Sequence, residues 1–124
     1  GPQQKNSNMR LKRQFRMNSR SEFLRVRQEG RSYAGQYLVM ALLEDHQLSP
    51  RFKFGIIVTK KIGNAVTRNL VRRRIKGLLS TFCNSLEFSG YIVIIPRYRS
   101  KDATFRNLES DWNNLGKKSG ITIK

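Results

Sequence analysis

The strongest constraint on the fold is a strand–helix–strand order between residues 54 and 95. The segment 54–59 (FGIIVT) is rich in β-branched residues, and 91–95 (YIVII) is a continuous apolar run that ends at Pro96. Between them, apolar residues follow the i, i+4, i+7, i+8, i+11 spacing of a helix with one buried side: Val71, Ile75, Leu78, Leu79 and Phe82. This order predicts a crossover in a mixed sheet, with helices packed against that sheet and 91–95 inside it.

Further segments extend this plan toward both ends of the chain. The apolar run 37–43 predicts a strand, which we expect to pair with 54–59 as a hairpin. Ser19 and Glu22 form a capping-box pattern, which predicts a helix over 20–28 that stops at Gly30. After Asp102, the expected cap, apolar residues at helical spacing predict a last helix that ends before Gly116: Phe105, Leu108, Trp112 and Leu115. We expect Trp112 to lie in the core.

The charge of the chain points to a polyanionic partner. The formal net charge is +17 over 124 residues, and no Asp or Glu lies between Asp45 and Glu87. The densest run, 60–76 (KKIGNAVTRNLVRRRIK), holds seven basic residues and no acidic one. A basic run alone is usually a solvated face, but here the excess extends over the whole chain and favours nucleic acid.

The same run supplies the residues expected to contact nucleic acid. Arginine presents a planar fork that matches phosphate oxygens, lysine adds a point charge, and asparagine can both donate and accept. The candidates are Lys60, Lys61, Asn64, Arg68, Asn69, Arg72 and Arg73. Asn64 is also the expected N-cap of the helix. Arg74 lies nearer the apolar side, and two roles stay open for it: contact with nucleic acid, or a side chain that snorkels or pairs with an acid elsewhere in the protein.

A second basic zone surrounds the first helix. Its cations are Arg10, Lys12, Arg13, Arg16, Arg20, Arg25, Arg27 and Arg31. Phe15 and Phe23 are interleaved with them, a mixture that can stack on splayed bases while following a single-stranded backbone. Core packing is an equal alternative for Phe23. Phe15 is expected either to pack near Phe23 or to anchor the N-terminal arm.

Few features favour a catalytic or metal site in the protein itself. One cysteine, Cys83, and one histidine, His46, exclude both an internal disulfide and a zinc cluster. Cys83 is expected to be a buried thiol without a role. The acids are scattered, and residues 44–46 (EDH) are expected in a solvated turn that at most binds a divalent ion weakly. We therefore assign no catalytic and no metal-binding residue.

Length and hydropathy predict one soluble domain. We expect a disordered N-terminal tail with a tag remnant over 1–9, a single RNA-binding domain over 10–116 and a C-terminal tail over 117–124. No apolar stretch approaches the roughly 20 residues that span a bilayer. The expected location is the cytoplasm, with no membrane partner.

The pattern Lys60-Lys61-Ile-Gly-Asn64-Ala-Val-x-Arg68-Asn69-x-x-Arg72-Arg73 resembles the signature of the bacterial ribonuclease P protein subunit. The resemblance covers roughly residues 10–116. It implies an α/β (α+β) two-layer sandwich with a mixed central sheet of about four strands, three helices and a left-handed βαβ crossover. Unlike the usual family motif, this chain has Lys76 in place of a further arginine, followed by Gly77.

The resemblance also implies a function. In that family an RNA subunit uses Mg²⁺ to remove the 5′ leader of precursor tRNA, and the protein aids substrate and metal-ion binding without a tightly held cofactor. The implied partners are ribonuclease P RNA and precursor tRNA, with no obligate protein partner evident. The implied RNA-binding residues are Lys60, Lys61, Asn64, Arg68, Asn69, Arg72, Arg73 and Lys76. The implied leader-binding cleft contains Phe15, Arg16, Phe23 and Arg27.

Two other functions remain as alternatives. A ribosomal or ribosome-associated structural protein shares the small size, high basicity and mixed α/β fold. A protein-only nuclease is disfavoured because the acids do not cluster in the sequence.

Overall fold

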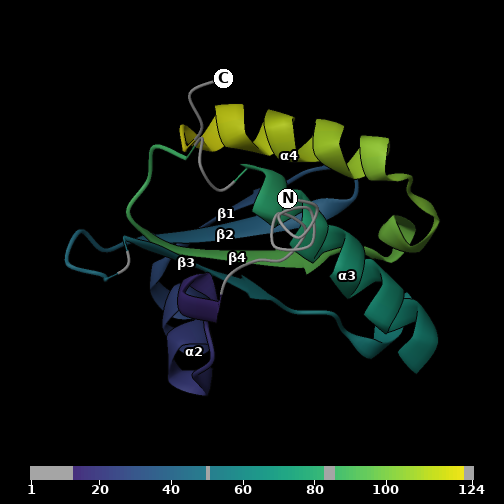
Figure 1. Ribbon diagram of the computed structural model, residues 1–124, viewed down its shortest axis with the longest axis horizontal. Helices are drawn as coiled ribbons and strands as arrows, with labels where there is room; N and C mark the ends of the chain where they lie inside the picture. The colour runs from purple at the N-terminus through teal and green to yellow at the C-terminus, as the bar shows by residue number, and fades with distance from the viewer. Residues whose placement is uncertain (1–12, 50, 83–85, 122–124) are drawn as a thin grey trace, which may run out of the picture.

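The computed structural model describes residues 13–49, 51–82 and 86–121 (Figure 1). In chain order the elements are η1 (Arg13–Phe15), α2 (Arg20–Glu29), β1 (Arg31–Ala34), β2 (Leu38–Glu44), β3 (Phe52–Ile56), η2 (Lys60–Ile62), α3 (Ala65–Phe82), β4 (Gly90–Pro96), η4 (Tyr98–Asp102) and α4 (Phe105–Ser119), where η marks a 3-10 helix. Across the described residues, no helix combines the length and apolar character needed to cross a membrane.

The four strands form one mixed sheet in the order β1-β2-β4-β3. β4 pairs antiparallel with β2, where Met40 lies opposite Ile94, and parallel with β3, where Phe54 lies opposite Ile92. The predicted central position of the 91–95 run is therefore confirmed. The predicted hairpin between 37–43 and 54–59 is wrong, because the strand that is apolar on both faces separates them. The antiparallel partner next to β2 in sequence is β1, which the sequence did not predict.

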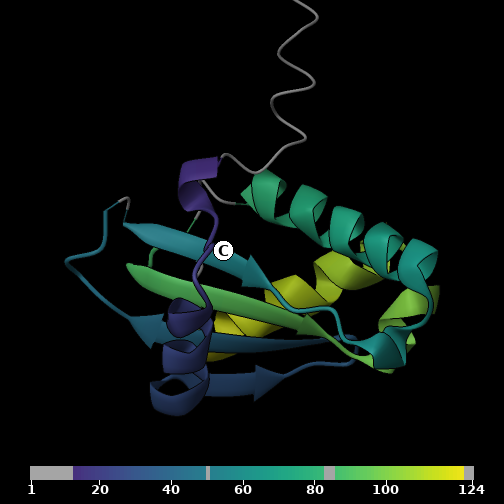
Figure 2. The ribbon, with the colours of Figure 1, turned by 90° about the horizontal axis from the view of Figure 1, so that it is seen from below.

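Helices cover both faces of the sheet (Figures 1 and 2). Because successive side chains of a strand point to opposite faces, β2 and β4 each contribute to two cores. α3 and α4 pack on the face that carries Leu42 and Ile92, whereas α2 packs on the face that carries Ala41 and Val93. The mixed four-stranded α+β sandwich is confirmed, and α2 adds cover on the second face.

The β3–α3–β4 connection is a parallel crossover, as the sequence predicted. Figure 2 shows β3 and β4 running in the same direction, with α2 in front of the sheet and α4 behind it, and α3 packs on the same face as α4. Viewed from the α3 side with both strands pointing up, β4 lies to the left of β3. The crossover is therefore left-handed, against the right-handed default for such units.

The apolar stripe predicted for the long helix is the centre of the larger core. Val71, Ile75, Leu78 and Leu79 are buried, and Phe82 packs partly buried at its end. The core position predicted for Trp112 is confirmed, since its ring is fully buried between Phe54 and Phe82, with centroid distances of 6.5 and 6.3 Å.

Two predicted helix caps are wrong because nearer partners take their place. Thr104, not Asp102, caps α4, in a capping box with Asn107. Ser19 precedes α2 as expected, but its hydroxyl contacts that of Ser21 at 2.7 Å and makes no bond to the helix backbone. Glu22, the other half of the expected box, points to the sheet instead.

The last helix runs past its expected end. α4 continues through Gly116 to Ser119, and Gly120 ends it with a left-handed φ of 80°. Ile121, expected in a C-terminal tail, is buried in the larger core. The residues expected to form a tail over 1–9 lie outside the described residues, as does Cys83.

Candidate nucleic-acid interface

A sharp turn connects the sheet to the basic face of α3. After β3 the chain passes through η2, where Ile62 is buried while Lys60 and Lys61 are exposed. Gly63 follows with a φ of 152°, which disfavours any other residue there. Asn64 Oδ1 then accepts a hydrogen bond from the Thr67 backbone N–H at 2.9 Å, so the predicted N-cap is confirmed. This turn holds two lysines beside the positive end of a helix.

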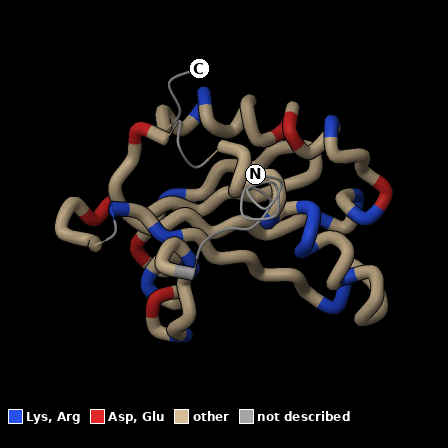
Figure 3. Tube along the Cα trace, in the orientation of Figure 1, with Lys and Arg blue, Asp and Glu red and all other residues tan. Residues whose placement is uncertain are grey.

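The predicted RNA-contact residues gather on α3 and the turn before it. Figure 3 shows basic residues along this helix and no acidic one on it. The exposed members are Lys60, Lys61, Asn64, Asn69 and Arg73, and the half-buried members are Arg68, Arg72 and Lys76. Because no carboxylate neutralises this face from within α3, it is a surface suited to phosphate groups.

Three arginines of α3 donate hydrogen bonds within the protein, two of them to backbone carbonyls and one to a side chain. Arg68 Nη1 donates to the Gly63 carbonyl at 2.7 Å, and Arg74 Nη1 donates to the Ala103 carbonyl at 2.9 Å. Arg72 Nη1 donates to Asn69 Oδ1 at 3.0 Å. Arg74 therefore links α3 to the segment before α4, which favours a structural role, with a backbone carbonyl as its partner in place of the expected acid.

Arg73 is the arginine of α3 with the fewest ties to the protein. It is exposed and makes no hydrogen bond or ion pair with any other residue that the structure describes. Its whole fork is available to a ligand, whereas Arg68 offers only the donors that Gly63 does not use.

Lys76 connects the basic face of α3 with the segment before α2. Burial, and then the Arg16 and Arg72 guanidinium groups, lower the pKa of Lys76. Arg16 is held in place by a parallel β-bridge to Phe54. The N-terminal basic zone and the α3 face thus meet at Lys76, where an added anion would relieve the repulsion. The adjacent Gly77 has open space around it.

A groove lies beside α2, on the other face of the sheet. It has a volume of about 550 Å³ and is lined by Asn18, Ser19, Arg20, Phe23, Leu24, Arg27 and Ile57. Phe23 is half-buried, and its ring covers Gly55 so closely that a Cβ there would collide with it. Phe23 packs in the smaller core, which confirms that role, and it also forms a wall of the groove; its contact with bases stays a prediction.

Two residues predicted for this cleft lie elsewhere. Phe15 stacks on Phe52 with a centroid distance of 4.8 Å, so it anchors the N-terminal arm to the larger core. Arg16 is exposed near Lys76 and does not line the groove. Arg10 and Lys12 lie outside the described residues.

The sequence reasoning missed several residues of the groove wall, notably Leu24 and Ile57. The signal for Leu24 was present, because Arg20, Phe23, Leu24 and Arg27 follow the i, i+3, i+4, i+7 spacing of one helix side. Ile57 had no such signal, since its place in the groove depends on where α2 crosses the sheet.

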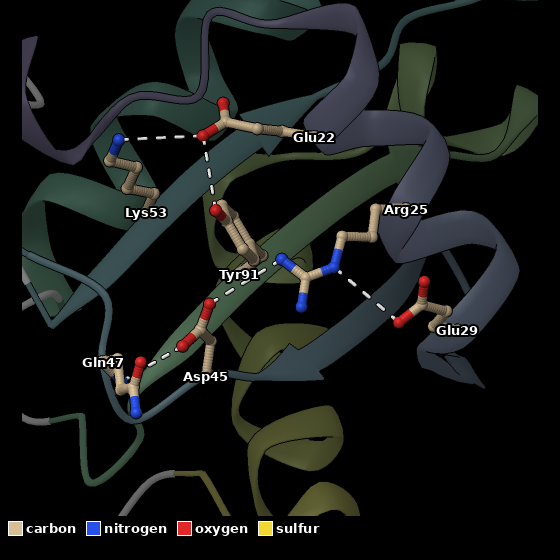
Figure 4. A network of polar contacts seen from close by, with 7 residues as sticks. All are labelled: Glu22, Arg25, Glu29, Asp45, Gln47, Lys53 and Tyr91. Carbon is tan, nitrogen blue, oxygen red and sulfur yellow. Dashed lines mark hydrogen bonds and ion pairs between the residues drawn. The ribbon is translucent and has the colours of Figure 1, made fainter.

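A polar network holds α2 against the sheet (Figure 4). Glu22 lies 3.7 Å from Lys53 Nζ and accepts a hydrogen bond from the Tyr91 hydroxyl at 3.4 Å. Arg25 lies between Glu29, at 3.7 Å, and Asp45, at 3.8 Å. Burial, and then the nearby Glu22 carboxylate, raise the pKa of Tyr91. Arg25, predicted as part of the basic zone, is thus paired with acids.

Neither the network nor the turn after β2 forms a recognisable metal site. Asp45 also accepts a hydrogen bond from the Gln47 backbone N–H at 3.1 Å, which organises the turn. Within residues 13–49, 51–82 and 86–121, no three His, Cys, Asp or Glu side chains are grouped closely enough to hold a metal ion.

Comparison with known proteins gives one consistent result. The sequence model of the family described as Ribonuclease P matches residues 11–120. The ribonuclease P protein component of Clostridioides difficile (strain 630) is 41% identical over 104 residues, covering 83% of this chain and 90% of the relative. That of Clostridium novyi (strain NT) is 32% identical over 111 residues, covering 90% and 98%.

Solved structures agree with the sequence relatives. The RNase P protein of Staphylococcus aureus superposes with a TM-score of 0.79 at 26% identity, covering 88% of this chain and 98% of that protein. The RNase P protein from Thermotoga maritima superposes with a TM-score of 0.73 at 25% identity, covering 83% and 96%.

Proposed function

Because this chain belongs to the ribonuclease P protein family, we propose that it is the RNA-binding subunit of a ribonucleoprotein that removes the 5′ leader from precursor tRNA. In this proposal the RNA subunit performs the hydrolysis with Mg²⁺, and the protein increases the affinity for substrate and metal ions. The partners are ribonuclease P RNA and precursor tRNA, and the place of action is the cytoplasm.

The observation that carries this proposal is the uncompensated basic face of α3. A surface with Lys60, Lys61 and Arg73 exposed, and with no acidic residue on the helix, is costly to assemble without a polyanion. The proposal assigns no hydrolytic step to the protein, because its described carboxylates are engaged in ion pairs or scattered.

The groove beside α2 fits the second part of the role. Its Phe23 ring offers an apolar wall, and Arg20 and Arg27, both exposed, lie on the same side of α2. A single strand needs this combination of stacking surface and cations. Ile57 lines the groove three residues before Lys60, so one strand leaving the groove can pass directly to the α3 face.

Precursor-tRNA processing at low Mg²⁺ tests the proposal in three reactions: protein alone, RNA subunit alone, and both. We expect cleavage by the RNA subunit to rise when the protein is added. Failure of the protein to stimulate the RNA subunit would refute the proposal, and cleavage by the protein alone would restore the protein-only nuclease. The ribosomal alternative has no support from the family match.

A matched pair of variants tests where the RNA binds. Lys61→Gln removes an exposed charge next to α3, and Lys117→Gln removes the same charge from the last turn of α4. We expect Lys61→Gln to weaken RNA binding and to reduce the slope of log affinity against log salt by about one. Lys117→Gln should leave both unchanged. Equal effects of the two variants would show that only net charge matters.

A further inference from the structure

The turn between β4 and α4 presents a tyrosine to solvent. Tyr98, the first residue of η4, is 61% exposed. The turn is fixed on both sides: the Arg97 N–H donates to the Tyr37 carbonyl at 2.8 Å, and the Ala103 carbonyl accepts the bond from Arg74 of α3. The backbone that carries this exposed ring is therefore anchored, so little backbone conformational entropy remains to be lost when a ligand binds the ring.

One cation lies against this ring, and two more lie on the neighbouring η2. Lys101 Nζ lies 4.8 Å from the centroid of the Tyr98 ring, within cation–π range. η4 packs against η2, which carries the exposed Lys60 and Lys61. Figures 1 and 2 both place η4 beside the start of α3. The tyrosine thus stands at the edge of the surface proposed to bind RNA phosphates.

The neighbouring acid compensates Lys101, so the charge left for phosphate is that of Lys60 and Lys61, which make no ion pair with the described residues. Asp102 is the one acidic residue of η4, and it is engaged by Lys101 at 3.2 Å. Arg99 is exposed and lies 5.5 Å from the centroid of the Tyr37 ring, on the other side of the turn. An isolated exposed aromatic would need no explanation. An aromatic on an anchored turn, with phosphate-binding groups beside it, has the composition of a single-strand binding site.

We infer that Tyr98 is a stacking platform for one unpaired base of the RNA strand whose phosphates lie against Lys60 and Lys61. Stacking on the phenol ring accepts any base, so this contact adds affinity and fixes the path of the strand without reading its sequence. The inference rests on the proposed function. The unpaired nucleotide belongs either to the RNA subunit or to the leader of the substrate, which present the same chemistry.

Two substitutions of the same residue separate the ring from its hydroxyl. Tyr98→Leu removes the aromatic face and keeps an apolar side chain, whereas Tyr98→Phe keeps the ring. The full-length protein is titrated separately into ribonuclease P RNA, into precursor tRNA with a leader and into mature tRNA. We expect Tyr98→Leu to weaken one of the first two complexes roughly 5- to 150-fold, the range of a base–aromatic stack. Tyr98→Phe should bind within about twofold of the wild type.

The pattern of losses identifies the source of the base. A loss confined to ribonuclease P RNA assigns it to the RNA subunit, and a loss for precursor tRNA but not for mature tRNA assigns it to the leader. The salt dependence should stay unchanged in Tyr98→Leu, because no phosphate contact is removed. Wild-type affinity of Tyr98→Leu for all three RNAs, or equal losses in Tyr98→Leu and Tyr98→Phe, would overturn the inference.

A spectroscopic measurement on the wild type keeps the inference testable even if a variant loses its fold. In the RNA that shows the loss, or in both RNAs if neither variant folds, 2-aminopurine is placed at successive unpaired positions. Stacking on Tyr98 should quench its fluorescence at one position on binding. Absence of quenching at every position would overturn the inference. Failure of the wild type to bind any of these RNAs would instead refute the proposed function.

Discussion

Asp111 provides a sharp test of how α4 is attached to the sheet. Its Oδ1 accepts a hydrogen bond from the Gln36 N–H, and its Oδ2 accepts bonds from the N–H groups of Tyr37 and Leu38, all at 2.9 Å. The side chain is buried, and a Cβ at Gly35 would collide with its carboxylate. One carboxylate on α4 therefore closes the turn between β1 and β2, more than 70 residues away in sequence.

The expected cost of removing this carboxylate follows from the three bonds. A hydrogen bond to a charged group contributes about 1.5–3 kcal/mol. The sum is discounted because Gln36 is exposed and Tyr37 is half-buried, so water can reach two of the three N–H groups. We expect Asp111→Ala to lower the free energy of unfolding by about 3–4 kcal/mol. Asp111→Asn keeps one oxygen but turns a donor toward an N–H group, and should lower it by about 2 kcal/mol.

Urea unfolding monitored by circular dichroism measures these losses. Glu109→Gln is the matched control, because Glu109 lies on the same helix and makes no hydrogen bond or ion pair with the described residues. We expect the control to change the free energy of unfolding by less than about 0.5 kcal/mol. A loss below about 1 kcal/mol for Asp111→Ala, with an unchanged dependence on urea concentration, would refute the reasoning.

Three further substitutions test other features of the fold and site. A Cβ at Gly77 would meet no heavy atom within 4 Å, so Gly77→Ala should stabilise α3 by about 1 kcal/mol and raise Tm by roughly 3–6 °C in calorimetry; a fall in Tm would contradict this. Gly55→Ala should destabilise the protein by about 1–3 kcal/mol in urea unfolding and weaken leader binding, because the Phe23 ring must move; unchanged binding would exclude a role for that wall. Burial and then Arg16 lower the pKa of Lys76, so the unfolded chain binds this proton more readily and stability rises with pH from the folded pKa toward 10.5. Arg16→Gln should raise the pKa of Lys76 in an NMR titration, and an unchanged titration would show that Arg16 has no influence.

Local periodicity predicted the elements that bury a whole side of a helix or both faces of a strand. The stripe from Val71 to Leu79 is buried as predicted, and the 91–95 run is the centre of the sheet. These signals are reliable because a buried face requires an apolar residue at every repeat of the helix or strand. β1 escaped prediction because it is a short, mostly exposed edge strand, whose conformation comes from pairing with β2 and from the bond network of Asp111.

Helix ends and strand partners were predicted less well because they depend on competition between alternative partners, some of them far apart in the sequence. Glu22 is close enough in sequence to cap α2, yet Lys53 and Tyr91 of the sheet engage it instead. Asp102 could cap the last helix, yet Thr104 forms the full capping box. The first choice is made by partners that become neighbours only when the sheet assembles, whereas the second is a local one between Thr104 and Asn107.

The sequence by itself determined that α3 has one apolar side and one basic side, because helical spacing assigns each side chain to a side regardless of its surroundings. Only the tertiary structure decided which of those cations are available. Arg74 is held by the Ala103 carbonyl, 29 residues away, while Arg73 is left without a partner among the described residues. The groove was likewise decided by how α2 crosses the sheet over Gly55 and Ile57. Hydrogen-bond partners and groove walls come from segments far apart in the chain, and no local pattern records them.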